Sequence, residues 1–254
     1  MSYQAKHVYD MKPSPPDARD FRAMVSHYPP PPSEAIIPSI PPCRDQGHEG
    51  ACWGFCGTGG RASYAIAAGD TTLLSPAFLY WNTRQAMGDD VDDTGSDMRT
   101  GLDTMLKIGI CPDSAMPYIA GQFAAVPPAD AAGLAAPYRI ASYSRVMDMD
   151  TVKGALAAGH PVLCGISVYR GFETTRDGIV PPPAPGEMPI GGHAILAVGY
   201  KDDASEPSGG RIQLLNSWGT GAGQNGMYFI PYSYLNFAAG EAGTQLSEAW
   251  VISP

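Results

Sequence analysis

The sequence predicts an α+β fold, because helical patterns come first along the chain and strand patterns come later. Three helices are expected at 53–68, 75–87 and 97–108, and each is followed at once by a glycine. A short helix is expected at about 149–158. Strands are expected near 161–168, 194–200, 211–217, 226–230 and 248–252. This order of elements is typical of helices and a sheet that occupy separate parts of one fold.

Local signals support these helices and strands. Ser75 precedes Pro76, which is the pattern of an N-cap residue followed by proline at the first helical position. The helix at 53–68 carries small and apolar residues, as a buried helix does. The strands alternate only partly between apolar and polar residues, as expected where both faces of a sheet are covered.

Proline divides the chain into an arm and a body. Ten of the 25 prolines lie within residues 1–42, so this stretch cannot form a regular helix. We expect residues 1–40 to form an extended arm and residues 41–254 to form the body. Within the body, a helical lobe of about 45–125 and a β-rich lobe of about 138–254 are joined by a Pro- and Ala-rich connection.

Composition excludes several classes of partner. The formal net charge of −9 argues against binding to nucleic acid or to anionic membranes. No apolar run approaches the roughly 20 residues that span a membrane. The N-terminus lacks the apolar core of a secretory signal, so we expect a cytoplasmic protein or one exported without a cleavable signal peptide.

The five cysteines form no obvious disulfide framework, because their number is odd and a protein without a signal peptide favours reduced thiols. If one of them is catalytic, the other four could form two bridges or none. The sequence has no CxxC motif and no histidine pair at ligand spacing. Residues 90–95 resemble the start of a calcium loop, but Gly101 stands where the loop needs glutamate. We therefore expect no metal and no cofactor.

Three short blocks carry the functional signal. They read DQGHEGACW at 45–53, GGHAILAVGY at 191–200 and NSWGTG at 216–221. In sequence and order they resemble the cysteine, histidine and asparagine regions of papain-family cysteine proteases, of the bacterial type. His193 follows Cys52 within the roughly 130–150 residues typical of this family, and Asn216 lies slightly beyond. Alone, each residue would be an ordinary core or turn residue; their joint occurrence points to catalysis.

The resemblance implies a papain-like fold of two lobes that meet at a cleft. Cys52, at the start of a helix, would be the nucleophile, because a helix N-terminus and an imidazolium both favour the thiolate. His193 would be its ion-pair partner and general acid, and Asn216 would hold the imidazole. Gln46 and the Cys52 backbone N–H would bind the oxyanion.

The resemblance also implies a set of residues that bind substrate in the cleft: Gly95, Ser96, Asp97, Met98, Gly192, Ala194 and Trp218. Several aspartates crowd the segment around Gly95 and Ser96: Asp89, Asp90, Asp92, Asp93 and Asp97. Either the cleft prefers basic or polar substrate residues at this place, or the aspartates simply solvate a loop. One departure concerns Glu49, which stands where most family members carry a cysteine. The disulfide usual beside the nucleophile therefore cannot form.

The function expected from these residues is a cysteine endopeptidase that acts on peptide or protein substrates through an acyl-enzyme intermediate. Two other functions stay open. A thiol acyltransferase or transamidase would use an amine instead of water, and a non-catalytic papain-like binding protein would keep only the scaffold.

The arm carries apolar and aromatic anchors that a disordered tail would not need, among them Tyr9, Met11, Phe21 and Tyr28. Forty extended residues span on the order of 100 Å, enough to reach the active site. The arm therefore either occludes the cleft or packs on the outer face and adds stability.

Overall fold

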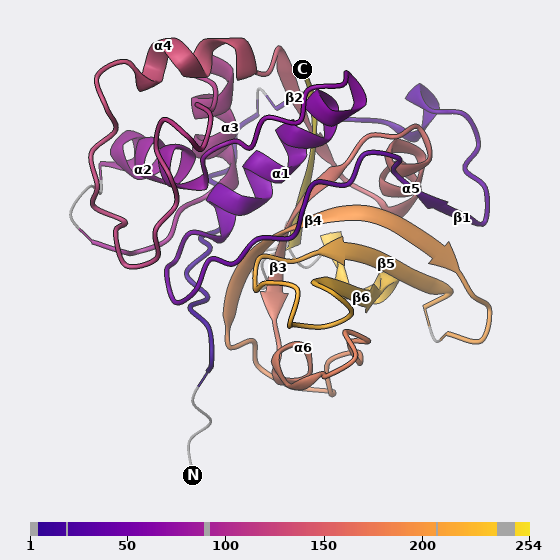
Figure 1. The fold of residues 1–254 in the computed structure, drawn as a ribbon. Coiled ribbons are helices and arrows are strands. Elements are labelled where there is room, and N and C mark those ends of the chain that lie inside the picture. The colour runs from indigo at the N-terminus through magenta and orange to yellow at the C-terminus, as the bar shows by residue number, and fades with distance from the viewer. Residues whose placement is uncertain (1–4, 19, 89–91, 207, 238–246) are drawn as a thin grey trace.

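Helices and strands gather in two lobes, which confirms the α+β prediction (Figure 1). The computed structural model describes residues 5–254 except 19, 89–91, 207 and 238–246. The helices are α1 (Cys52–Ala67), α2 (Pro76–Met87), α3 (Met98–Lys107), α4 (Ala131–Ala135), α5 (Met149–Ala157) and α6 (Arg170–Thr174). The strands are β1 (Glu34–Ile36), β2 (Ser142–Val146), β3 (Val162–Val168), β4 (Gly191–Asp202), β5 (Gly210–Leu215), β6 (Met227–Pro231) and β7 (Ser247–Ser253).

The long helices begin where their capping residues predict. The Ser75 side chain accepts a hydrogen bond from the Phe78 N–H at the start of α2, and the Asp97 side chain accepts one from Thr100 at the start of α3. The sequence did not predict α4, which lies in the connection between the lobes. Its five residues have no side-chain cap, so its local signal is weak.

Within the described residues the strands form one seven-stranded sheet in the order β2-β7-β3-β4-β5-β6, with β1 paired to β4. All the pairs are antiparallel. The predicted strands are present, whereas β1 and β2 were not predicted. The β2 strand reads Ser-Tyr-Ser-Arg-Val and lies at the sheet edge, so it has little of the apolar pattern that marks a strand. No helix of the described chain is long and apolar enough to cross a membrane.

Helix α1 joins the two lobes, because it packs on α2 on one side and on β4 on the other. Small residues make this approach close. A Cβ on Gly101 of α3 would lie 1.8 Å from the Trp53 ring nitrogen, and one on Gly54 would lie 2.6 Å from the Pro76 carbonyl. Both glycines are therefore required by the packing of α1 in the helical lobe.

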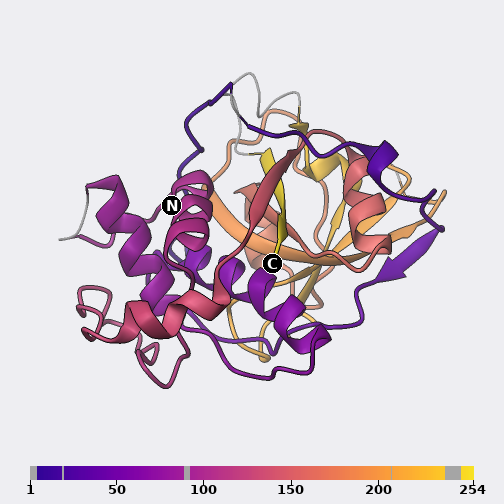
Figure 2. The same ribbon diagram turned by 90° about the horizontal axis from the view of Figure 1, so that it is seen from above.

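The N-terminal arm is an ordered strap over much of its length (Figures 1 and 2). It makes isolated parallel bridges from Asp10 to Gly192 and from Lys12 to Asp97, which lie in different lobes. Farther along, Arg22 bridges to Arg145 on the edge strand β2. The arm ends as β1, so it runs from the boundary between the lobes to the sheet.

Candidate active site

Cys52 is the first residue of α1, and this helix differs from α2, α3 and α5 at its N-terminus. Those three helices have side-chain caps, whereas Ala51 offers none to α1. Backbone N–H groups of the first turn are therefore left without a capping side chain, and they favour an anion at this place. The Trp53 and Ala194 N–H groups act on the Cys52 sulfur in this sense.

Burial opposes this effect in the structure as it stands. Cys52 is 1% exposed, and burial raises the pKa of its thiol to about 11 despite those backbone N–H groups. Asp10 of the arm raises the thiol pKa further. Burial at this place therefore favours the neutral thiol over the thiolate.

His193 on β4 and Asn216, just after β5, form the second half of the site. The His193 Nε2 lies 2.8 Å from the Asn216 Oδ1, which also accepts the Ser217 N–H at 2.8 Å. Because that oxygen can only accept, Nε2 carries a proton, and a neutral imidazole then has its lone pair on Nδ1. His193 is fully buried, and burial lowers the pKa of its imidazole to about 4.

The two lobes bring the cysteine and the histidine together. The Ala194 N–H that faces the Cys52 sulfur belongs to the residue next to His193. Among the described residues, the His193 Nδ1 has no hydrogen-bond partner, so no Cys52–His193 hydrogen bond is formed in this structure and Nδ1 keeps its lone pair for a proton from the thiol. Trp218 covers the imidazole, with ring centroids 5.2 Å apart, and Phe172 meets it edge-on.

Gln46 is fully buried, and its polar groups are held on several sides. The Ser217 hydroxyl donates to Gln46 Oε1 at 2.5 Å, and Gln46 Nε2 donates to the Glu49 carbonyl at 2.8 Å. Since an amide nitrogen has two protons, one remains for another acceptor. This is the donor that an oxyanion beside Cys52 would need.

The residues predicted to bind substrate lie along the arm. The Lys12 N–H donates to the Ser96 carbonyl at 3.0 Å, and the Met11 N–H donates to the Gly192 carbonyl at 3.2 Å. A Cβ on Gly95 would lie 2.0 Å from the Asp10 carbonyl, so glycine is needed for the arm to pass.

The other predicted residues have distinct places. Trp218 stacks on His7 of the arm with centroids 4.0 Å apart, and Ala194 faces the thiol as described. Met98 is fully buried, and its sulfur lies beside Gly165. The Asp97 carboxylate caps α3, which leaves less of it for a substrate.

Glu173 of α6 anchors the first part of the arm. Its carboxylate accepts the Lys6 and His7 N–H groups and the Tyr9 hydroxyl, the last at 3.0 Å. The Tyr9 ring in turn lies 6.2 Å from the His193 ring. Residues 5–14, which we call the cleft segment, therefore cover the catalytic residues.

Sequence reasoning missed several residues around the site. Glu248 is 3% exposed and accepts the Ser14 N–H at 3.3 Å; a charged residue in a strand otherwise predicted as buried was its signal. Tyr118 donates its hydroxyl toward Gln46 and Glu49, and it had no sequence signal because its partners lie some 70 positions away.

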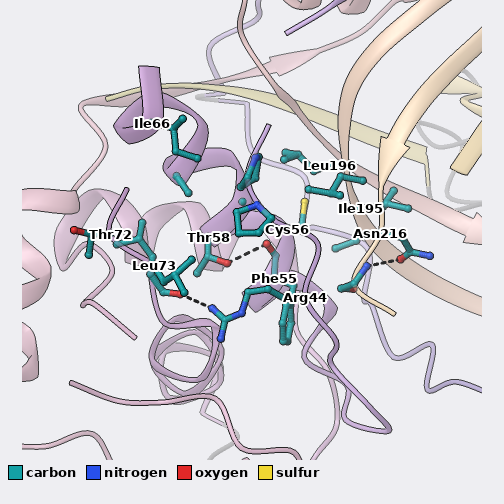
Figure 3. A pocket seen from close by; sticks show the side chains of 18 of the residues that line it. Arg44, Phe55, Cys56, Thr58, Ile66, Thr72, Leu73, Ile195, Leu196 and Asn216 are labelled. Carbon is teal, nitrogen blue, oxygen red and sulfur yellow. Dashed lines mark hydrogen bonds between the residues drawn. The ribbon is translucent and has the colours of Figure 1, made fainter. Parts of the chain in front are cut away.

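Nothing in the described chain groups three or more potential metal ligands. All five cysteines are free, so none of the bridges left open by the sequence is formed. Asp89 and Asp90 lie outside the described residues. An apolar pocket of about 260 Å³ lies between α1, residues 194–196 of β4 and the end of β5 (Figure 3). Cys56 and Asn216 reach this pocket, but Cys52 and His193 do not line it.

Comparison with known proteins shows which family the chain belongs to. A model of papain family cysteine proteases matches residues 34–239, which is most of the chain. The chain belongs to the papain family of cysteine proteases. An uncharacterized peptidase C1-like protein, L477, of Acanthamoeba polyphaga mimivirus is 31% identical over 210 residues, which cover 75% of this chain and 64% of that protein. This papain-family chain spans about half to two thirds of the length of the curated relatives it matches.

Solved structures agree with this assignment. Xylellain, a cysteine protease from Xylella fastidiosa, superposes with a TM-score of 0.84 at 26% identity, and the match covers 100% of this chain and 98% of that one. Digestive procathepsin L 3 of Tenebrio molitor gives a TM-score of 0.71 at 21% identity over 93% of this chain and 75% of that one. The papain-like fold implied by the three sequence blocks is therefore confirmed.

Proposed function

We propose that this chain is a cysteine endopeptidase in which Cys52 attacks the peptide carbonyl and His193 protonates the leaving amine. The observation that carries the proposal is the Cys52 thiol at the uncapped start of α1, with the His193–Asn216 pair from the other lobe beside it. Membership in the papain family supports it.

The chemistry follows from these positions. Cys52 loses its proton to the His193 Nδ1, and the thiolate adds to the carbonyl carbon while Gln46 Nε2 and the Cys52 N–H stabilise the oxyanion. The C–N bond then breaks as the imidazolium gives its proton to the amine. Water, deprotonated by His193, cleaves the thioester and restores the thiol. Asn216 keeps the imidazole oriented throughout.

Substitution of the nucleophile tests this mechanism. Cys52→Ala should lower kcat by on the order of 10⁴-fold or more with the fold intact, and Gln46→Ala by roughly 10²–10³-fold. Asn216→Ala should cost less than Cys52→Ala, because asparagine orients and does not react. An internally quenched peptide blocked at both ends measures endopeptidase activity. Wild-type turnover by Cys52→Ala would overturn the mechanism.

The two alternatives are separated by simple assays. A thiol acyltransferase would form amide products when an amine is added, which mass spectrometry detects. A binding protein would not label with an epoxide probe at Cys52. The His193–Asn216 hydrogen bond and the oriented Gln46 amide favour a catalyst, because a binding protein has no need of them.

We further propose that the cleft segment holds the enzyme inactive. It pairs with Ser96 and Gly192, where a substrate backbone would bind, and no carbonyl of its described residues accepts a hydrogen bond from Cys52 N–H or Gln46 Nε2. The segment thus blocks the site without presenting a bond for cleavage. Substrate access requires this segment to leave.

We also propose a preference for basic residues on the non-primed side of the cleft, carried by Glu248. Its side chain packs against Gly165, where an added Cβ would lie 2.9 Å from the Glu248 Cγ, and its carboxylate accepts the Ser14 N–H of the cleft segment at 3.3 Å. A positional-scanning peptide library tests this proposal. Glu248→Gln should reduce any preference for Lys or Arg, whereas Asp97→Asn should not. An unchanged preference in Glu248→Gln would contradict it.

A further inference from the structure

The loop before the nucleophile contains a buried acid with no role in the chemistry above. Glu49 is 4% exposed and lies between Gln46 and Cys52. A buried carboxylate costs free energy unless hydrogen bonds offset it, so its presence three residues from the catalytic cysteine needs a reason. Burial raises the pKa of Glu49, and the hydrogen bond from Tyr118 partly opposes this rise.

The contacts of Glu49 form a ring with the oxyanion glutamine. The Glu49 backbone carbonyl accepts Gln46 Nε2 at 2.8 Å. Its carboxylate accepts the Tyr118 hydroxyl at 2.9 Å and the Gly121 N–H. The same Tyr118 hydroxyl lies 2.7 Å from the Gln46 carbonyl, so its single proton is shared between acceptors at both ends of the 46–49 turn.

The other side of the loop is held by a second carboxylate. Asp93 accepts the Gly50 N–H through both oxygens at 3.0 Å and the Tyr80 hydroxyl at 2.5 Å. Its negative charge faces Glu49 and raises the pKa of that residue. Two acids, Glu49 and Asp93, therefore hold the loop, and each accepts hydrogen bonds from a tyrosine hydroxyl and a backbone N–H.

The Gln46 amide takes its direction from the Ser217 hydroxyl on its oxygen and from the Glu49 carbonyl on its nitrogen, and the second of these contacts depends on the loop. Gly47 has a positive φ of 61°, so the backbone turns sharply between Gln46 and Glu49. If the carboxylate anchor were lost, the turn could relax, and the Glu49 carbonyl would no longer fix Gln46 Nε2. One proton of that amide is used by the Glu49 carbonyl, so the direction of the other is set by the same bond.

We propose that Glu49 and Tyr118 are positioning residues that aim the Gln46 amide at the oxyanion. The inference rests on the proposed function, because it assigns Gln46 a role in binding the tetrahedral intermediate. Neither residue touches the substrate or the thiol. Their effect should appear in steps that form an oxyanion and be absent from thiol reactions that form none.

The test compares two reactions of Cys52 in the full chain. A peptide aldehyde forms a tetrahedral hemithioacetal that occupies the oxyanion site, whereas iodoacetamide alkylates the thiolate by displacement of iodide. Glu49→Gln and Tyr118→Phe keep the side-chain shape and should weaken aldehyde binding and lower kcat by about 10-fold, less than loss of the donor itself. KM and the alkylation rate should change by no more than about twofold. Coverage by the arm affects both reactions, so their ratio isolates the oxyanion site.

Matched variants and a double substitution complete the experiment. Glu206→Gln and Tyr138→Phe also remove a carboxylate charge and a carboxylate-bound hydroxyl, far from Cys52 in sequence, and should leave the ratio unchanged. The double variant Glu49→Gln/Tyr118→Phe should lose little more than either single variant, because both break one ring. Glu49→Ala should lose more than Glu49→Gln, which retains an acceptor.

Three results would overturn the inference: unchanged aldehyde affinity, an alkylation rate that falls in parallel with kcat, or fully additive single effects. Thermal unfolding of each variant shows whether it folds, and the isosteric variants keep the test valid if Glu49→Ala does not. Failure of the proposed function looks different, because the wild-type chain would then bind the aldehyde no more tightly than Cys52→Ala does, whatever the alkylation rate of its thiol.

Discussion

The two halves of the N-terminal arm are attached in different ways. The cleft segment lies at the boundary between the lobes, where it is held by hydrogen bonds to Glu173, Ser96, Gly192 and Glu248 and by the buried Tyr9 and Met11 side chains. Residues 20–36 lie on the sheet, through hydrogen bonds to Arg145 and through β1. The first half lies beside catalytic groups, and the second pairs with strands of the body. We therefore expect the first half to affect activity more than the second half does.

Two deletions from the N-terminus should show the largest difference between the halves of the arm. Removal of residues 1–14 should uncover Cys52 and raise its alkylation rate at pH 7 by on the order of 10²-fold, because a thiol of pKa about 11 is ionised in roughly one molecule in 10⁴ and one of the usual pKa of about 9 in roughly one in 10². Removal of residues 1–36 should lower the melting temperature strongly, because β1 and the buried Ala23 are lost. Stopped-flow alkylation and calorimetry measure the two effects. Equal reactivity of the full and 15–254 chains would disprove coverage.

Coverage of the catalytic residues by the cleft segment should depend on pH. In the covered state burial lowers the pKa of His193 to about 4 and raises that of Cys52 to about 11. Because the covered imidazole binds its proton less well than a solvated one, acid favours uncovering as pH falls from about 6.5 towards 4, by up to about tenfold per pH unit. Burial and the neighbouring His48 also lower the pKa of His7, which adds to this effect.

The pKa of the Cys52 thiol shifts in the opposite direction, because burial raises it. The uncovered thiol loses its proton more readily than the covered one, so the cleft segment should also loosen as pH rises above about 9. Coverage should therefore be strongest between about 6.5 and 9. Cleavage of the cleft segment by an added protease, measured from pH 4 to 10, checks this window. Among nearby groups, Asp10 acts on the thiol and Glu173 lies against Tyr9. Cleavage that does not vary with pH would contradict the expectation.

Substitution of one tyrosine in each half of the arm should have smaller effects that still distinguish the two halves. Tyr9→Ala removes a buried ring beside His193 and a hydroxyl on Glu173, and should raise peptidase activity by about 10-fold even though loss of the ring also lowers the melting temperature. Tyr28→Ala, its counterpart in the second half, removes a ring that packs on Gly154. It should lower the free energy of unfolding by about 1–3 kcal/mol and leave activity unchanged. The reverse pattern would show that the two halves had been assigned wrongly.

Much of the fold was predictable because its signals are local. Ser75 and Asp97 cap their helices through backbone N–H groups three residues away, so a short string of sequence fixes each helix start. Strand β3 is apolar throughout and could be recognised, whereas β2 and α4 could not. The polar edge strand and the five-residue helix depend on contacts with distant segments more than on their own patterns.

Part of the candidate site was also predictable from sequence, and part was not. Three short sequence blocks predicted the candidate catalytic residues, which are Cys52, His193, Asn216 and Gln46. In the structure, His193 and Asn216 are joined by a hydrogen bond. The preference expected from the aspartates was less secure. Asp93 is used by Gly50 and Tyr80, and Asp97 caps α3, so a pattern of charge did not reveal which charge is free.

The sequence by itself determined the fold class, the helix starts and the chemistry available at Cys52 and His193, because these depend on residue type and on neighbours a few positions away. Only the tertiary structure decided that the arm pairs with Ser96 and Gly192, that burial raises the pKa of Cys52 and lowers that of His193, and that Tyr118 and Glu49 form hydrogen bonds with Gln46. Each of these depends on partners that are far apart in the chain. Burial and hydrogen bonding between such partners exist only once the chain has folded.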